Sequence, residues 1–226
     1  MNTATPRQLA LCAGWSLLLM AALAGFAYGF GFNQIYIAHD ELATVQQLTA
    51  HESLFRWLFL AFIGILVLDI LVSWALYYFL KPWHAALSLL TACFRIMYTA
   101  LLGVALAPLA FLLSSLPAVA AKGTIVLYCF QAFTAIWSMA LLVFGIHLGL
   151  LAYLLFRYTP LPKTGAALLL LAGLAYIAAH GLPIIWPGYA AYRLTLEALL
   201  SLPMALGELA LALWLIVKGG KSKKAI

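Results

Sequence analysis

Glu208 is the residue of this sequence that packing alone explains least well. It lies in the segment 207–220, GELALALWLIVKGG, which is apolar from Leu209 to Val217 and then ends in Lys218. A lysine at a membrane surface needs no special partner, because its long stem carries the ammonium group out to water. A carboxylate within hydrocarbon has to be paired, protonated or hydrated, and is a functional candidate by default. The sequence therefore marks Glu208 as a candidate ligand- or proton-binding residue.

Three further ionisable residues lie in apolar runs at matching depths. Asp69 and Arg95 are each thirteen residues from Pro82, so the two share a level if the flanking segments form a helical hairpin. His147 and Glu208 each lie nine residues before the end of an apolar run. At the rise of an α-helix this places both roughly 14 Å above that end. The spacing predicts one polar layer contributed by four helices.

Intramembrane charges are tolerated when they face the bundle interior and find partners. Asp69 and Arg95 are the natural ion pair. Three states are open to Glu208: it pairs with Arg95 as well, it is protonated because it is desolvated, or it hydrogen-bonds His147. We take Asp69, Arg95, His147 and Glu208, with Tyr98, as the candidate polar cluster.

Hydroxyl groups one helical turn away can add hydrogen bonds to this cluster. Tyr98 follows Arg95 at this spacing, and Ser73 follows Asp69. The alternative is a purely structural role, in which these buried polar groups only determine how the helices pack.

The elements that must position these residues are membrane-spanning helices. Of the 226 residues, 67% are hydrophobic and 8% are charged, whereas soluble domains carry about 25% charged residues. A span needs about 20 apolar residues. We predict an all-α, polytopic membrane protein, a single membrane domain over residues 1–226. Its six spans are expected at about 9–32, 57–80, 86–112, 125–156, 164–182 and 196–217, with an outer loop at 33–56.

Charge distribution predicts the orientation of this bundle. Six spans place both termini on one side of the membrane. That side carries eight lysines and arginines, and the other side carries three. The eight are Arg7, Lys81, Arg157, Lys163, Lys218, Lys221, Lys223 and Lys224, and the three are Arg56, Lys122 and Arg193. Cytoplasmic loops hold the excess of basic residues. Both termini are therefore expected in the cytoplasm. The outer loop should contain a short amphipathic helix on the membrane surface, with Leu42, Val45 and Leu48 on its apolar face.

The segments 147–177 and 207–220 resemble a bacterial family of multi-span membrane proteins known as domain of unknown function 4386. The resemblance rests on His147 before a small-residue run, the Pro162-Lys163 turn, Gly173 and Tyr176 in a leucine-rich span, and Glu208, Trp214, Lys218 and Gly219 near the end. Phe94-Arg95 is similar to a further family element, which usually has a glutamate three residues after the arginine; here that position is Tyr98. The resemblance implies a six- or seven-helix protein of a bacterial inner membrane and no particular activity.

Three functions fit these observations, and none names a substrate or a reaction. The first is a polar cavity that binds or transports a small molecule, a lipid-like ligand or a proton, since His and Glu at one depth can relay protons. The second is an intramembrane metal-dependent hydrolase using His147, Glu208 and Asp69. The third is a structural or regulatory subunit whose charges only specify assembly. We prefer the first.

Other partners and cofactors are not expected. One histidine with two carboxylates beside an arginine is a poor zinc site, so we predict no metal. The outer-loop residues His39, Asp40, His51 and Glu52 are a weaker metal candidate, better explained as a solvated acidic loop. Phosphate-binding loops, haem-attachment motifs and nucleic-acid motifs are missing from the sequence. The bilayer is the predicted partner, and the sequence does not indicate an oligomeric state.

Overall fold

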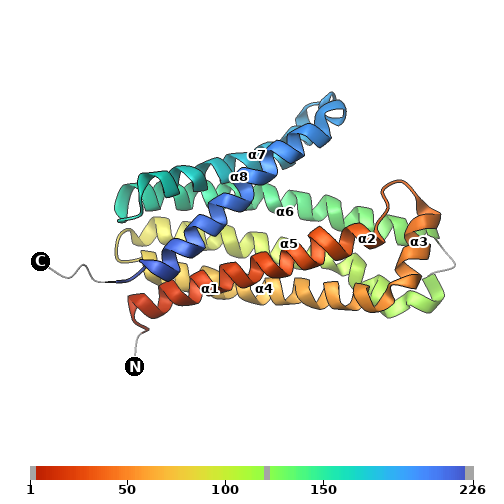
Figure 1. Cartoon of the computed structure of the whole chain (residues 1–226), viewed down its shortest axis with the longest axis horizontal. Coiled ribbons are helices and arrows are strands. Elements are labelled where there is room, and N and C mark those ends of the chain that lie inside the picture. Colours follow the sequence, from red (N-terminus) through yellow and green to blue (C-terminus); the bar gives the residue numbers. More distant parts are fainter. Residues whose placement is uncertain (1–3, 120–122, 222–226) are drawn as a thin grey trace, which may run out of the picture.

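The computed structural model describes residues 4–119 and 123–221, and helices make up nearly all of this part of the chain (Figure 1). In chain order the elements are α1 (Pro6–Ala24), the π-helical turn η1 (Gly25–Phe32), α2 (Asn33–Ile35), α3 (Glu41–Ala50), α4 (Glu52–Leu80), α5 (Ala85–Val119), α6 (Gly123–Tyr158), α7 (Lys163–Ile185) and α8 (Tyr189–Val217).

Within residues 4–119 and 123–221, six helical segments are long and apolar enough to cross a membrane, which confirms the predicted all-α, polytopic fold class. They are Pro6–Ile35, Glu52–Leu80, Ala85–Leu116, Gly123–Tyr158, Lys163–Ile185 and Thr195–Val217. Every span is longer than the apolar run that predicted it, by a residue or more at one end or both. The helices continue into polar and aromatic residues at the membrane surface, where hydropathy alone gives no boundary. Both ends of the described chain lie at the same end of the bundle (Figure 1).

The largest boundary error concerns the predicted outer loop at 33–56. This segment is mostly helical, because α2 continues the first span, α3 follows, and α4 already begins at Glu52. The Asp40 side chain starts α3 by accepting a hydrogen bond of 2.9 Å from the backbone N–H of Ala43.

The short helix α3 packs against α6, which corrects the prediction that its apolar face lies on the membrane surface. Leu48 and Thr44 are completely buried, whereas Leu42 is exposed. The inward face is therefore set by the contact with α6, and the apolar spacing of Leu42, Val45 and Leu48 did not identify it.

The segment that follows the third predicted span, 86–112, is also helical up to residue 119. Helix α5 passes through Pro108 and continues to Val119, while Lys122 lies outside the described residues. Helix α7 similarly includes Pro183, just beyond the predicted end of the fifth span at residue 182. Proline removes one backbone hydrogen bond but does not end a helix that neighbouring helices hold in place.

Helices α4, α5, α6, α7 and α8 pack in sequence order, and α1 lies against both α4 and α8 (Figure 1). Small residues allow the closest approaches. A Cβ atom on Gly145 would lie 2.8 Å from the carbonyl oxygen of Gly173, and one on Gly207 would lie 2.6 Å from the Cβ atom of Ala172. The contact between α6 and α7 and that between α7 and α8 therefore require glycine at these positions.

Arg7 connects the two ends of the chain. Its guanidinium donates hydrogen bonds to the carbonyl oxygens of Leu215, Ile216 and Gly219 at 3.1, 2.5 and 2.8 Å. Leu215 and Ile216 belong to the last turn of α8 and Gly219 directly follows its C-cap, so the cation also interacts favourably with the negative end of the helix dipole. The start of α1 thus fixes the end of the helix that carries Glu208.

Candidate functional site

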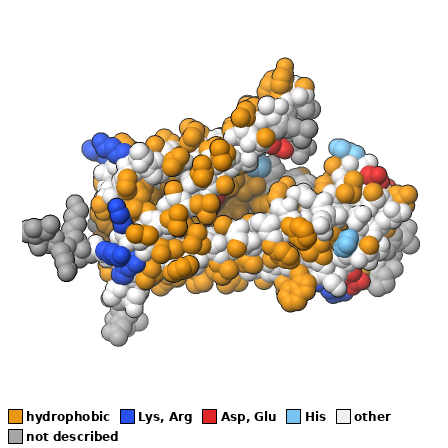
Figure 2. All heavy atoms as spheres, in the orientation of Figure 1, with side chains coloured by type: hydrophobic (Ala, Val, Ile, Leu, Met, Phe, Trp, Pro, Cys, Tyr) orange, Lys and Arg blue, Asp and Glu red, His pale blue; other side chains and the backbone are white. Residues whose placement is uncertain are grey.

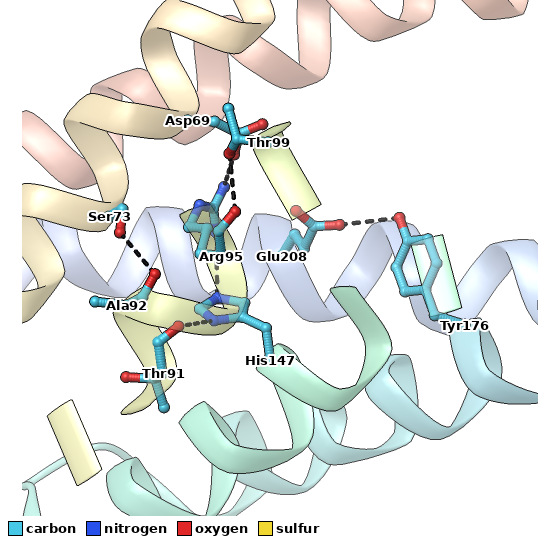
Figure 3. Close-up of polar contacts among 9 residues, drawn as sticks. All are labelled: Asp69, Ser73, Thr91, Ala92, Arg95, Thr99, His147, Tyr176 and Glu208. Carbon is cyan, nitrogen blue, oxygen red and sulfur yellow. Dashed lines mark hydrogen bonds and ion pairs between the residues drawn. The ribbon is translucent and has the colours of Figure 1, made fainter. Parts of the chain in front are cut away.

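Arg95 on α5 is the centre of a buried polar network (Figure 3). Its Nη2 donates a hydrogen bond of 2.6 Å to Oδ1 of Asp69 on α4, and the two side chains are 1% and 0% exposed. The Arg95 guanidinium also lies over the Phe144 ring, 5.4 Å from its centroid. The predicted ion pair is present, and it joins neighbouring helices in the interior of the bundle.

His147 on α6 extends this network to a third helix. Its Nδ1 lies 2.8 Å from the carbonyl oxygen of Thr91, and its Nε2 lies 3.4 Å from Nη1 of Arg95. A carbonyl only accepts and a guanidinium only donates, so Nδ1 carries the proton and Nε2 is the acceptor. This arrangement requires the neutral imidazole.

Glu208 on α8 is bound by a residue that the sequence argument had left outside the cluster. The Tyr176 hydroxyl on α7 donates a hydrogen bond of 3.1 Å to Oε1 of Glu208. Of the three states that the sequence left open for Glu208, the salt bridge with Arg95 and the hydrogen bond with His147 are not found among the contacts of the described residues. Figure 3 shows why: Glu208 approaches from α8, whereas Arg95 is directed to Asp69 and His147.

The other two predicted hydrogen-bonding residues have different roles. The Tyr98 ring is buried against Phe144, with centroids 4.6 Å apart. The Ser73 hydroxyl donates to the carbonyl oxygen of Ala92 at 3.2 Å and so links α4 to α5 without contacting Asp69. Helical spacing identified the correct faces, but it could not identify the acceptors.

Phe144, like Tyr176, belongs to the site but was not part of the cluster predicted from the sequence. Its ring stacks on His147 at 5.6 Å and meets Tyr176 edge-on at 5.2 Å, as well as contacting Tyr98 and Arg95. Its position three residues before His147, on the same helix face, was the available signal. Phe144 thus forms an apolar wall that contacts both Arg95 and His147 of the buried network and Tyr176 of the Tyr176–Glu208 pair.

Two polar atoms of the ion pair have no partner among the described residues. These are Oδ2 of Asp69 and Nε of Arg95, and both are buried. Native structures pair most such atoms, so each unpaired one requires an explanation. The network therefore has hydrogen-bonding capacity that the chain itself does not use.

Glu208 and Tyr176 are only partly buried, in contrast to Asp69, Arg95 and His147. Figure 2 shows that this face of the molecule is hollowed between α8 and the first span, with mostly hydrophobic side chains around the hollow. Glu208 thus lies on a helix that borders a recess, while the ion pair lies deeper in the bundle.

The metal-site alternatives find no support in this geometry. Within residues 4–119 and 123–221, no three His, Cys, Asp or Glu side chains are grouped as a metal would require. Oδ1 of Asp69 and Nε2 of His147 both point at the Arg95 guanidinium, which would repel a cation. The outer-loop candidate is divided between a helix cap at Asp40 and an exposed Glu52–Arg56 ion pair.

Comparison with known families now assigns the chain. The model of the family described as domain of unknown function (DUF4386) matches residues 12–219. The chain belongs to this family. Every residue of the DUF4386 resemblance, including Arg95, His147, Tyr176 and Glu208, falls within the matched region.

One similar protein is an uncharacterised protein of the archaeon Archaeoglobus fulgidus. It is 30% identical over 163 residues, which make up 72% of this chain and 83% of the archaeal one. No solved structure matches the chain. The comparisons therefore establish a membrane-helical family without transferring an activity.

Proposed function

We propose that this DUF4386 protein binds or transports a proton or a small cationic ligand at Glu208, in front of the buried Asp69–Arg95–His147 network. Tyr98 completes the candidate cluster as part of its apolar wall. The observation that carries the proposal is the charge balance of the site.

Two carboxylates and one guanidinium share this layer. Asp69 is paired with Arg95, and the hydrogen bonds of His147 require the neutral ring. An ionised Glu208 would therefore leave one uncompensated negative charge, which is unfavourable inside a membrane. Among the described residues, its carboxylate accepts a hydrogen bond from the Tyr176 hydroxyl, which is neutral. One positive charge has to come from outside the chain, as a proton or a bound cation.

Partial exposure supports exchange at this carboxylate. Glu208 is partly exposed and lies on α8, the helix that borders the recess beside the first span, and the aromatic rings of Phe144 and Tyr176 lie in the interior nearby. Aromatic faces favour organic cations once water is excluded. A small hydrophobic amine and a proton would then compete for the same group.

The decisive experiment measures proton flux into liposomes that contain the purified protein and an internal pH-sensitive dye. We expect Glu208→Gln to abolish the flux, because the amide can neither bind nor release the proton. Glu52→Gln is the matched control. Glu52 is the first residue of α4, and its carboxylate is in an exposed ion pair with Arg56. Flux unchanged by Glu208→Gln would refute transport through this residue.

Binding without transport is tested separately by equilibrium dialysis with the hydrophobic cation tetraphenylphosphonium. The wild-type protein should retain the cation and release a proton as it binds, and Glu208→Gln should retain none. If the wild-type protein neither binds this cation nor takes up the extra proton, the polar cluster has only a structural role.

We also propose the cytoplasmic membrane as the location, with both termini in the cytoplasm and the chain forming one membrane domain. The support is the accumulation of Lys and Arg at the end of the bundle where both chain ends lie (Figure 2). A reporter fused after Lys221 that is active only in the cytoplasm should be active, and an inactive one would reverse the orientation.

A further inference from the structure

A second feature, independent of the Glu208 site, is an apolar groove on the outer surface between α4 and α5. It has a volume of about 480 Å³. Helix α4 contributes Ile70, Trp74 and Tyr77, and helix α5 contributes Cys93, Ile96 and Met97. Trp74, Ile96 and Met97 are about half exposed, so the groove is open to whatever surrounds the bundle.

The groove leads toward a cation at the membrane surface. Tyr77 lines the groove, and the Lys81 ammonium group lies over the same Tyr77 ring, 5.6 Å from its centroid. Lys81 is exposed and directly follows the last residue of α4. An occupant of the groove would thus have its apolar part beside Tyr77 and its other end beside Lys81.

The same turn adds a second feature that attracts anions. Helix α5 begins at Ala85, four residues after Lys81, and the N–H groups of its first turn lack intrahelical partners. The N–H of Leu87 donates instead to Nδ1 of His84 at 3.2 Å, so the anion-binding capacity of this turn lies in the N–H groups before Leu87. They also carry the positive end of the helix dipole. Trp83, in the turn, is partly exposed, as is usual at the level of lipid headgroups.

Among the described residues, this end of the bundle has no acidic side chain. The sequence has six acidic residues, and all lie elsewhere: Asp40, Glu41, Glu52 and Glu197 toward the opposite end, and Asp69 and Glu208 in the interior. The charge at the Lys81 end is therefore complementary to an anionic headgroup.

We propose that the α4–α5 groove is a binding site for an anionic glycerophospholipid. One acyl chain lies in the groove, and the phosphate contacts Lys81 and the start of α5. The groove floor includes Ser73 and Ala92, which are hydrogen-bonded to each other one turn from Asp69 and Arg95. A bound lipid would therefore press together the two helices that carry the buried ion pair.

The experiment uses the exposed Cys93 in the groove as the attachment point for a fluorophore, with Cys12 and Cys129 replaced by alanine. The full-length protein is placed in nanodiscs of phosphatidylcholine mixed with phosphatidylglycerol, and bromine is carried on the acyl chains of one lipid or the other. Brominated phosphatidylglycerol should quench the label more strongly than an equal fraction of brominated phosphatidylcholine. A lysine near an anionic lipid surface predicts a preference of about fivefold, corresponding to about 1 kcal/mol.

Two variants separate the site from general surface charge. Lys81→Gln should remove most of the preference, whereas Lys163→Gln should keep it. Lys163 is a fair control because it also lies over an aromatic ring, that of Phe156 at 5.9 Å, at the same end of the bundle. Ala100→Phe, at an exposed position that lines the groove, should reduce quenching by both lipids.

Three results would overturn the proposal. These are equal quenching by the two lipids, an equal loss in both lysine variants, and efficient Cys93–Cys93 cross-linking between two chains. The last would assign the groove to a second copy of the protein.

Discussion

The two halves of the polar layer differ in how deeply they are buried and in whether the chain balances their charge. Asp69, Arg95 and His147 are fully buried, and each makes a direct polar contact with another helix. Glu208 and Tyr176 are partly exposed, and the donor of the hydrogen bond between them, the Tyr176 hydroxyl, carries no charge. The first group has the geometry of a structural connection, whereas the second has a charge that the chain leaves uncompensated.

This difference assigns separate roles to residues that look alike in the sequence. Asp69 and Glu208 are both carboxylates in apolar helices at similar depth. Asp69 contacts a cation at 2.6 Å, and Glu208 contacts a phenol at 3.1 Å. Only Glu208 therefore needs a proton or a cation from outside.

The largest expected effect comes from breaking the buried ion pair. Arg95→Met leaves Asp69 buried without a cation. Because the loss of one partner of a buried ion pair typically costs about 3–5 kcal/mol, the unfolding free energy should decrease by about this amount. Chemical unfolding in mixed micelles measures it. Arg56→Met is the control, because its ion pair with Glu52 has the same 2.6 Å distance but is exposed, and should cost only about 0.3–0.5 kcal/mol.

A buried pair that contributes nothing to stability would remove the contrast between the two halves. An Arg95→Met variant as stable as Arg56→Met would show that the buried pair does not contribute to stability. It would also indicate that Asp69 is neutral in the folded protein.

The second effect displaces the Glu208 half without changing the Arg95 network. Gly207→Leu places a side chain where a Cβ atom would already meet Ala172 at 2.6 Å, and overpacking of this kind costs about 1–3 kcal/mol. Unfolding free energy and proton flux should both decrease, because α8 has to move away from α7. Gly103→Leu is the control, since a Cβ atom there meets nothing within 4 Å.

Equal sensitivity of Gly207 and Gly103 would show that the close contact between α7 and α8 does not hold Glu208 in place. If Gly207→Leu lost stability but kept its proton flux, the position of Glu208 that this contact sets would not be needed for the proposed function.

The smallest effect on stability is expected for the bond within the exposed half. Tyr176→Phe removes the hydroxyl that donates to Glu208, and hydrogen bonds between membrane helices average about 0.6 kcal/mol. Unfolding free energy should fall by about this amount, and proton flux should change more than stability does. Tyr192→Phe, at an exposed tyrosine of α8, should change neither quantity. A destabilisation of Tyr176→Phe as large as that of Arg95→Met would place Glu208 within the structural network after all.

Several features of the fold and site follow from the sequence alone. The length of the apolar runs determines six spans, because every backbone polar group in a bilayer has to be bonded within a helix. The equal distances of Asp69 and Arg95 from Pro82 correctly predict their pairing, because a tight turn fixes the register of a helical hairpin. The depth of His147 likewise places it within reach of Arg95.

Tertiary structure alone decides which atoms meet across helices that are distant in the chain. Depth is a single coordinate, and it does not give the rotation of α8 about its axis or its distance from α5. The contact at Gly207 and Ala172 holds α8 on α7, so Glu208 meets Tyr176 and remains apart from Arg95. Arg7 fixes the other end of α8 through backbone carbonyls, an interaction that has no side-chain signature in the sequence. The polar layer is therefore a property of the sequence, and its division into a closed ion-pair network and an open carboxylate is a property of helix packing.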